Sequence, residues 1–229
     1  MMLDGRVFLI TGAKGGLGTF VTQAFLGAGA KVAGSARSIV DTDFSHRNFA
    51  AFQADIGSRA HAQALVGKVL SQWTRIDGLV HLAGGYAGGQ TVNETDDATL
   101  ERMFDMNLRP FFHVAGAVLP AMQRQRAGSI LAIGSRTAVD PAAMLGAYSA
   151  SKAALVSLVR TIALENKQFG ISANAILPGT MDTPANRTAM PGADVKQWVQ
   201  PDQVASMLVH LASSSNVTGA LIPIYGGEL

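Results

Sequence analysis

Two residues with complementary proton chemistry stand four positions apart. Tyr148 and Lys152 are residues i and i+4 of an expected helix, so the phenol and the ammonium share one helix face and can meet at one site. Ser135 precedes Tyr148 by thirteen residues and directly follows an expected strand. A serine in that place either belongs to a site at the edge of the sheet or caps a turn. These three residues are the first candidates for catalysis.

A glycine-rich segment follows the first expected strand. Residues 11–18 read Thr-Gly-Ala-Lys-Gly-Gly-Leu-Gly, with Gly12, Gly16 and Gly18 as candidate turn residues and Leu17 between the last two. Glycine permits a tight turn and lets backbone N–H groups approach a pyrophosphate at the N-terminus of the following helix. By itself the segment is equally well an ordinary strand-to-helix turn, because its glycine spacing departs from the usual dinucleotide fingerprint.

Strand-like and helix-like apolar patterns alternate along the chain, and these elements must position the candidates. Strands are expected at 7–10, 31–35, 49–53, 78–82, 129–133, 172–176 and 221–224. Helices are expected at 17–25, from an N-cap at Ser58 to 73, at 96–125 with bends at Pro110 and Pro120, at 148–168 and at 201–212. This alternation predicts one doubly wound α/β domain over residues 1–229: a parallel, Rossmann-type sheet with helices on both faces. Ligands are expected beyond the carboxyl ends of the strands.

The composition excludes several classes of protein. Hydrophobic residues make up 48 % and charged residues 15 % of the 229 residues, which excludes disorder. A net charge of +2 without a Lys/Arg run argues against nucleic-acid binding. The absence of cysteine excludes thiol chemistry, and the five histidines lack metal-ligand spacing, so no metal is expected. With no signal-peptide pattern and no apolar run of about 20 residues, we expect a cytoplasmic protein without a membrane partner.

Taken in order, the motifs resemble those of the short-chain dehydrogenase/reductase family over essentially the whole chain. Residues 11–18 are similar to the family's glycine motif, and Ser135, Tyr148 and Lys152 are similar to its catalytic set. Asn107 resembles its helical asparagine. The resemblance implies cofactor contacts at Gly12, Gly16, Leu17, Gly18, Asp55, Ile56, Ala83, Gly84, Tyr148, Lys152, Pro178, Gly179, Met181 and Thr183.

Two positions depart from the family pattern. His81-Leu82 replaces Asn-Asn before Ala83-Gly84, so a side chain that usually bridges at this strand is expected to be missing. Residues 225–227 read Tyr-Gly-Gly where the family commonly has Val-Asp-Gly-Gly. This second change is expected to alter a C-terminal interface more than the chemistry.

The resemblance implies hydride transfer with a nicotinamide, in which Tyr148 is the general acid in reduction and the base in oxidation. A free phenol titrates near 10, and an ammonium about 5 Å away contributes about 3 kcal/mol at an effective dielectric of about 20. Lys152 is therefore expected to lower the pKa of Tyr148 by about two units and to anchor the ribose. Ser135 would donate to the substrate oxygen. Asn107 would distort its helix and seat a relay water, or is merely a capping or surface asparagine.

The end of the second strand indicates the cofactor. NAD enzymes place an acidic residue about twenty positions after the glycine motif, where this chain has Ala36 followed by Arg37 and Ser38. Lys14 adds a cation within the glycine loop, and no nearby carboxylate is expected to repel a 2′-phosphate. NADP(H) is therefore expected and NAD is less favoured, unless Arg37 merely lies in solvent.

Two loops, 84–89 and 179–198, are expected to line the substrate side. Tyr86, Met144, Leu145 and Trp198 offer an apolar wall there, or pack beneath a lid. The loops resemble dihydropteridine reductase through Gly-Gly-Tyr-Ala-Gly-Gly and Met-Asp-Thr-Pro-Ala-Asn-Arg-x-x-Met-Pro. That enzyme, however, has an acidic residue after its second strand and no serine at the place of Ser135. A small carbonyl or alcohol is expected, with a quinonoid pteridine as the alternative.

Other functions keep the same fold. A non-catalytic dinucleotide-binding or redox-sensing protein is one alternative, and the joint presence of Ser135, Tyr148 and Lys152 argues against it. An epimerase or dehydratase is another. The family resemblance further implies that helices around 100–125 and 148–168 pair across a two-fold axis, giving a homodimer or homotetramer.

Overall fold

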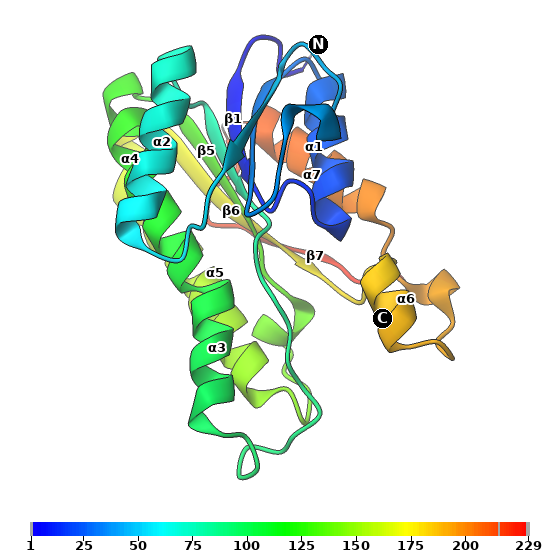
Figure 1. Ribbon diagram of the computed structural model, residues 1–229. Helices are drawn as coiled ribbons and strands as arrows, with labels where there is room; N and C mark the ends of the chain where they lie inside the picture. Colours follow the sequence, from blue (N-terminus) through cyan, green and yellow to red (C-terminus); the bar gives the residue numbers. More distant parts are fainter. Residues whose placement is uncertain (1, 215, 228–229) are drawn as a thin grey trace.

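A parallel β-sheet lies at the centre of the molecule, between helices on both of its faces (Figure 1). The computed structural model describes residues 2–214 and 216–227. In this part of the chain the sheet has seven strands in the order β3-β2-β1-β4-β5-β6-β7. They are β1 (Val7–Thr11), β2 (Lys31–Ala36), β3 (Phe49–Gln53), β4 (Gly78–His81), β5 (Gly128–Ile133), β6 (Ile171–Pro178) and β7 (Leu221–Ile224). The predicted doubly wound parallel sheet is thus confirmed.

The order of the strands fixes where a ligand can bind. Every neighbouring pair is parallel, so all carboxyl ends lie at one edge of the sheet. The winding reverses between β1 and β4, which are hydrogen-bonded neighbours although two strands separate them in the sequence. The loops on either side of such a switch point diverge and leave a crevice at the carboxyl edge. The candidate site is therefore expected beyond β1 and β4.

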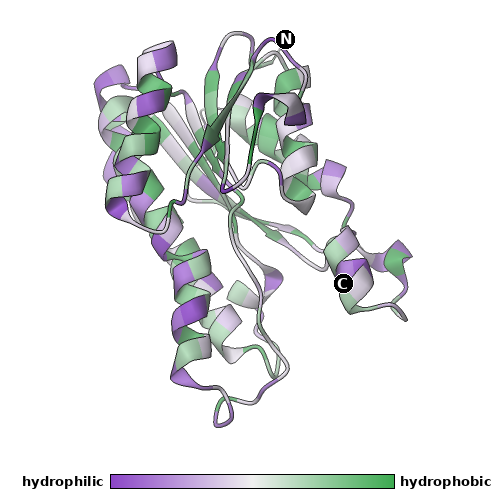
Figure 2. Ribbon diagram, viewed as in Figure 1, coloured by the Kyte–Doolittle hydropathy of each residue, from purple (hydrophilic) through white to green (hydrophobic). Residues whose placement is uncertain are grey.

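The helices cover the two faces through separate apolar clusters. One cluster joins the sheet to α2 (Arg59–Trp73), α4 (Arg109–Gln125) and α5 (Gly146–Asn166). The other joins it to α1 (Gly16–Gly27) and α7 (Pro201–Ser213). Figure 2 shows hydrophobic residues on the sheet and on the helix sides that face it, as expected for strands buried on both faces. The shorter α3 (Asp97–Asn107) and α6 (Pro184–Ala189) lie beyond the carboxyl edge, below the sheet in Figure 1.

Most predicted elements agree with the structure to within a few residues, and the exceptions have local causes. The Ser58 side chain accepts a hydrogen bond from the His61 N–H and caps α2, as predicted. The predicted helix 96–125, in contrast, is two helices, because α3 ends at Asn107 and α4 begins at Arg109. Pro110 lies in the first turn of α4, where its missing N–H breaks no hydrogen bond within the helix. The helix then continues through Pro120.

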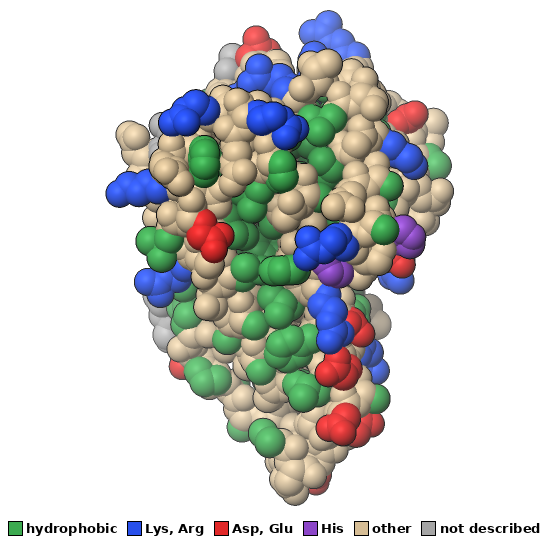
Figure 3. Space-filling model, turned by 90° about the vertical axis from the view of Figure 1, so that its left-hand side faces the viewer, with side chains coloured by type: hydrophobic (Ala, Val, Ile, Leu, Met, Phe, Trp, Pro, Cys, Tyr) green, Lys and Arg blue, Asp and Glu red, His purple; other side chains and the backbone are tan. Residues whose placement is uncertain are grey.

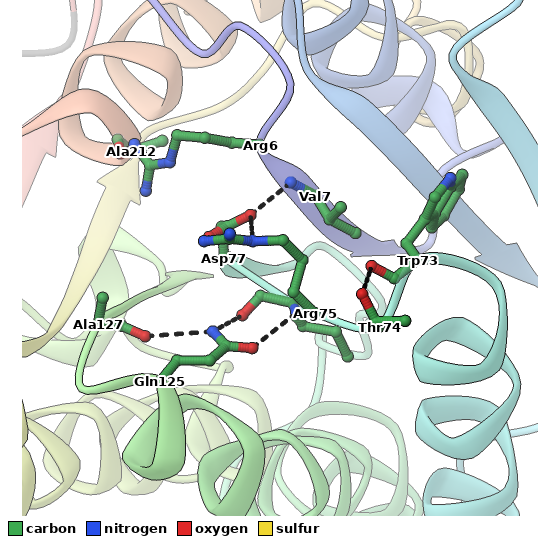
Figure 4. Close-up of polar contacts among 10 residues, drawn as sticks. Arg6, Val7, Trp73, Thr74, Arg75, Asp77, Gln125, Ala127 and Ala212 are labelled. Atoms are coloured by element: carbon green, nitrogen blue, oxygen red, sulfur yellow. Dashed lines mark hydrogen bonds and ion pairs between the residues drawn. The ribbon is translucent and has the colours of Figure 1, made fainter.

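A polar network fastens the amino end of the sheet, away from the candidate site (Figure 4). The buried Asp77 carboxylate accepts a hydrogen bond of 2.8 Å from the Val7 N–H and two of 3.1 and 3.0 Å from Nε of Arg75. Gln125 of α4 pairs with the backbone of Ile76, accepting at 3.1 Å and donating at 2.8 Å. These bonds satisfy groups that burial would otherwise leave unpaired.

Candidate active site

Ser135 and Tyr148 meet at the carboxyl edge of the sheet. Ser135 directly follows Gly134 at the end of β5, Tyr148 lies in the first turn of α5, and the Ser135 hydroxyl is close enough to the phenol to lower its pKa. The Ser135 hydroxyl also accepts from the Thr137 N–H at 3.2 Å and lies 3.0 Å from the Thr137 hydroxyl. Ser135 therefore caps the following 3₁₀ turn and also lies beside Tyr148 at the edge of the sheet, so the cap does not remove it from the candidate site.

Lys152 lies one turn further along α5 and is buried. Its ammonium donates a hydrogen bond of 2.9 Å to the Ile133 carbonyl at the end of β5. Burial lowers the pKa of Lys152 from 10.5 to about 8, because a charge removed from water is disfavoured. A Cβ added to Gly84 would lie 3.5 Å from Nζ and 2.8 Å from Oδ1 of Asn107, so glycine leaves room for both polar groups.

The pKa of Tyr148 is raised, which corrects the expected lowering by Lys152. Burial of the phenol is the main cause, the hydrogen bond to Ser135 opposes it, and the nearby Tyr86 adds to it. Lys152 is not among the causes of this shift. The prediction considered only the attraction of an ammonium about 5 Å away and neglected the burial of both groups.

Asn107 connects the loop after β4 to α5. It is fully buried as the last residue of α3, so the surface interpretation is wrong. Its Oδ1 accepts from the Gly85 N–H at 2.9 Å, and its Nδ2 donates to the Ser151 hydroxyl at 3.0 Å. The Ser151 hydroxyl in turn donates to the Tyr148 carbonyl at 2.7 Å. The helix break at Asn107 thus places one amide between the loop and the turn that carries Tyr148.

The glycine loop between β1 and α1 is too close-packed for side chains at two of its glycines. Gly12 has φ +71°, and a Cβ there would lie 2.9 Å from the Ala83 nitrogen. A Cβ on Gly18 would overlap the Gly12 carbonyl, and one on Gly16 would lie 3.3 Å from Cβ of Thr183. Glycine thus lets this turn pack directly against the segment after β4 and close to the segment after β6.

The N-terminus of α1 suits a phosphate group. All residues of α1 are described, and they include neither a side chain that caps the first turn nor an acidic residue in it. The free N–H groups and the helix dipole therefore favour an anion at this end. The adjoining cofactor candidates lie around it: Leu17 is buried in α1, Ala83 and Gly84 follow β4, and Pro178 ends β6. These residues fit a dinucleotide, whose pyrophosphate needs such an uncapped glycine turn.

The remaining cofactor candidates lie on both sides of that turn. Gly179 donates from its N–H to the Ile224 carbonyl at 2.9 Å, and Met181 forms a bridge with Val199. Thr183 caps α6 by accepting from the Asn186 N–H at 3.3 Å. On the other side Asp55 is exposed, and its carboxylate accepts from the Gly57 N–H at 3.0 Å, while Ile56 is buried. The structure thus gathers these residues at the same edge of the sheet.

A carboxylate stands beside Lys14, one of the two cations that were expected to bind a 2′-phosphate. The Lys14 ammonium lies 2.7 Å from Oδ1 of Asp43 and 3.4 Å from the Ser38 carbonyl. The expectation that no carboxylate lies nearby is therefore wrong. Arg37 is exposed, and its carbonyl accepts from Nε2 of Gln53 at 2.8 Å. Asp43 was missed because a 3₁₀ turn, Asp41–Asp43, brings it back toward the glycine loop.

Three of the four substrate candidates line one cavity of about 260 Å³. Tyr86, Met144 and Leu145 border it, and the Tyr86 ring packs edge-on against the Tyr148 ring with centroids 5.1 Å apart. Trp198 is not among its lining residues and is 6 % exposed, so it packs within the fold and offers no open wall. Sequence reasoning missed the polar lining residues Gln90, Thr95, Thr99 and Arg102, of which Thr99 and Arg102 lie three positions apart on one face of α3.

His81 provides a bridge that was expected to be missing. Its Nδ1 lies 2.9 Å from the Thr11 hydroxyl, so it links the ends of β4 and β1. Burial lowers the pKa of His81 to about 3, with a smaller lowering from the charge of Lys152, which keeps the imidazole neutral. At the other departure from the family pattern, the Arg136 guanidinium lies over the Tyr225 ring, 5.0 Å from its centroid.

Within the described residues, no helix combines the length and the hydropathy needed to cross a membrane. The same part of the chain contains no group of three or more His, Cys, Asp or Glu side chains arranged to hold a metal ion.

Comparison with known proteins gives consistent matches over nearly the whole chain. Residues 6–193 match the family model of the short chain dehydrogenases. The 3-oxoacyl-[acyl-carrier-protein] reductase of Thermotoga maritima is 32 % identical over 259 residues, covering 99 % of both chains. The 7alpha-hydroxysteroid dehydrogenase of Escherichia coli K12 is 30 % identical over 246 residues, covering 99 % of this chain and 95 % of that protein. Among solved structures, a 3-ketoacyl-(acyl-carrier-protein) reductase from Brucella melitensis complexed with NADH has a TM-score of 0.88 at 26 % identity, covering 99 % of both chains.

Proposed function

Because the chain belongs to the short-chain dehydrogenase/reductase family, we propose that it is an NADP(H)-dependent oxidoreductase acting on a small carbonyl or alcohol. The observation that carries this proposal is the placement of Ser135 beside Tyr148, close enough to lower the pKa of the phenol, one helical turn from the buried ammonium of Lys152. A carbonyl oxygen that reaches one of the two hydroxyls is within reach of the other. Two donors then converge on the atom where negative charge develops.

In the proposed mechanism Tyr148 is the proton donor. The bound nicotinamide supplies or accepts the hydride, and the chain must manage the proton and the developing oxyanion. Because burial raises the pKa of Tyr148, the phenol is protonated at neutral pH, which is the form that reduction requires. Ser135 donates to the same substrate oxygen. For oxidation the phenol must first lose its proton, so the alcohol reaction should be favoured by alkaline pH.

Lys152 and Asn107 are proposed to supply the proton and to position its donor. With a pKa of about 8, Lys152 is largely protonated at neutral pH and can exchange a proton near that value. Gly84 leaves its ammonium room to contact a ribose hydroxyl. Asn107 holds the loop at Gly85 and, through Ser151, the first turn of α5. A relay water at the helix break remains part of the proposal, linking Lys152 to Tyr148.

The preference for NADP(H) rests on the segment after β2. Ala36 ends the strand where an acidic residue would accept a ribose 2′-OH, and Arg37 follows it with an exposed side chain. No partner of the Arg37 guanidinium is found in the described part of the chain. An unpaired guanidinium can form charge-assisted bonds with a 2′-phosphate, as proposed also for Lys14 and Ser38. NAD remains the weaker cofactor in this proposal.

The substrate is proposed to enter the cavity beside Tyr86. A space of about 260 Å³ with both apolar and hydroxyl-bearing walls suits a small molecule with polar groups. The two curated relatives named above are a reductase of a 3-oxoacyl group and a dehydrogenase of a hydroxysteroid, so both names describe carbonyl–alcohol interconversion. A quinonoid pteridine is the second candidate, because the Tyr86 side chain is 66 % exposed and can stack on a planar ring.

A homodimer or homotetramer is proposed from the exposed helices. Figure 3 shows hydrophobic side chains gathered along the face that carries α3 and α4. Exposed large apolar residues on these helices and on α5 are Leu100, Met106, Phe112 and Leu164. Such residues, left in water in one chain, suit a contact between copies. Light scattering on the purified protein should give a mass of two or four chains, and a monomer would refute this part.

A panel of carbonyl compounds and a quinonoid pteridine, each with NADPH and with NADH, tests the function. Turnover of at least one carbonyl with preference for NADPH is expected. Turnover of the pteridine alone would select the second candidate. Tight dinucleotide binding without turnover of any compound would indicate a binding or sensing protein, and product that is not stoichiometrically reduced would indicate an epimerase or dehydratase.

A further inference from the structure

An ion pair crosses the region where the cofactor's adenosine ribose is proposed to bind. Lys14 belongs to the glycine loop, and Asp43 belongs to the 3₁₀ turn Asp41–Asp43 after β2. Their charged atoms lie 2.7 Å apart, and the same ammonium donates to the Ser38 carbonyl at 3.4 Å. In a Rossmann-type sheet these two segments surround the ribose next to the adenine. The pair thus joins the two sides of the proposed 2′-phosphate site.

Asp43 is held in place independently of Lys14. Its second carboxylate oxygen accepts from the Val40 N–H at 3.0 Å, and its own N–H donates to the Val40 carbonyl at 3.0 Å. Asp41, at the start of the turn, accepts from the Ala51 N–H at 2.7 Å, which fixes the turn to β3. The carboxylate is therefore a fixed acceptor, whereas Lys14 is a flexible chain with 46 % of its side chain exposed. The position of the ammonium is set by the carboxylate.

The two cations of this region differ in what they offer a phosphate. An ammonium has three donors, and in Lys14 two of these are engaged by Asp43 and Ser38. To reach a 2′-phosphate, Lys14 must loosen its contact with Asp43, and the phosphate must approach a carboxylate of like charge. Arg37 has no such partner in the described residues. Lys14 therefore contributes less to binding of the 2′-phosphate than a lysine in the glycine loop would if it had no carboxylate partner.

We propose that Asp43 is a specificity-determining residue that competes with the cofactor's 2′-phosphate for Lys14 and so limits the preference for NADP(H) over NAD(H). The proposal rests on the proposed function, because it takes a nicotinamide dinucleotide as the ligand. It differs from an acidic residue that accepts the ribose 2′-OH, since Asp43 acts on the phosphate through Lys14. Removing its charge should therefore tighten phosphate binding without weakening the binding of the unphosphorylated ribose.

The test measures binding of 2′,5′-ADP and 5′-ADP by calorimetry, because these probes differ only in the 2′-phosphate and require no turnover. Asp43→Asn keeps an oxygen that can accept from the Val40 N–H and removes the charge. It should bind 2′,5′-ADP about threefold to tenfold more tightly than the wild type, as expected for an exposed ion pair and one repelling charge. Binding of 5′-ADP should stay within about twofold. Asp97→Asn, on α3 at the far end of the molecule, removes the same charge and should change neither affinity.

A second background separates competition for Lys14 from direct repulsion. In Lys14→Met the gain from Asp43→Asn should shrink to about twofold or less, because no ammonium remains to be released. An equal gain in both backgrounds would overturn the inference, as would unchanged or weaker binding of 2′,5′-ADP by Asp43→Asn. Weaker binding of 5′-ADP would overturn it as well, since Asp43 would then be an acceptor of the 2′-OH. If wild-type protein prefers 5′-ADP while Asp43→Asn still gains affinity for 2′,5′-ADP, the proposed NADP(H) preference fails and this inference stands.

Discussion

Replacing Lys152 with methionine should stabilise the protein at neutral pH while it abolishes activity. Burial lowers the pKa of Lys152 from 10.5 to about 8. Each pKa unit corresponds to about 1.4 kcal/mol, so the charged side chain disfavours the folded state by about 3 kcal/mol at pH 7. Methionine fills a similar volume and removes this penalty, but it leaves the Ile133 carbonyl without its donor. Such an unpaired acceptor costs about 1–3 kcal/mol. A net gain of about 0–2 kcal/mol is expected.

The stability difference between Lys152→Met and the wild type should depend on pH. The folded state releases the proton of Lys152 near pH 8, and the unfolded chain keeps it up to about 10.5. Between these values the unfolded chain binds more protons, so the stability of the wild type rises with pH through this window. The variant lacks the group and gains nothing there. Its advantage should therefore be largest at pH 7 and should shrink by pH 10.

Thermal unfolding at both pH values measures this difference. For a chain of this size a gain of up to about 2 kcal/mol corresponds to a rise of at most about 8 °C in Tm at pH 7. Lys68→Met, which removes an exposed charge on α2, should change Tm little at pH 7. A Lys152→Met variant that is less stable than the wild type at pH 7, or whose advantage does not depend on pH, would refute the reasoning from burial.

Three further perturbations test other parts of the site. Ala36→Asp should reverse the cofactor preference toward NADH, because it adds an acceptor for the 2′-OH and a charge that repels the phosphate. Arg37→Ala should weaken the binding of NADPH about ten- to hundredfold. Unchanged ratios of NADPH to NADH affinity would contradict both expectations. Gly12→Ala should destabilise the fold by more than about 1 kcal/mol and weaken dinucleotide binding, because Gly12 has φ +71° and an added Cβ would lie 2.9 Å from the Ala83 nitrogen. The control Gly67→Ala lies in α2 with open space around it, and it should be neutral or stabilising. Hydrogen exchange over 180–199 should slow when NADP and a product analogue bind, and equal exchange with and without them would argue against a lid.

The fold was predictable because the apolar pattern is simple. Strands such as β1 and β6 are buried along their whole length, and the helices between them carry one apolar stripe each. This alternation of buried strands and amphipathic helices predicts a parallel sheet covered by helices on both faces. The junction at Asn107 was harder, because it depends on tertiary hydrogen bonds to Gly85 and Ser151. Pro110 indicated a bend close by, but the sequence did not show that the helix ends and a second one begins there.

The polar geometry was less predictable, since it depends on which groups lie buried together. The spacing of Tyr148 and Lys152 indicated a shared helix face, yet the pKa of the phenol follows from burial and was expected in the wrong direction. Asp43 and His81 were missed as partners because each pairs with a residue on a distant segment of the chain. Trp198 was expected either at the substrate wall, from its place in the 179–198 loop, or packed beneath a lid, and its burial favours packing.

Tyr148→Phe is the most direct test of the central claim that this phenol exchanges the proton during hydride transfer. Phenylalanine keeps the ring that packs against Tyr86 and removes only the hydroxyl. On the best carbonyl substrate, turnover should fall by at least about 10²–10⁴, the contribution typical of one acid–base group. The affinity for NADPH should stay within about threefold, because the phenol is not its main anchor. Turnover close to that of the wild type would contradict the mechanism.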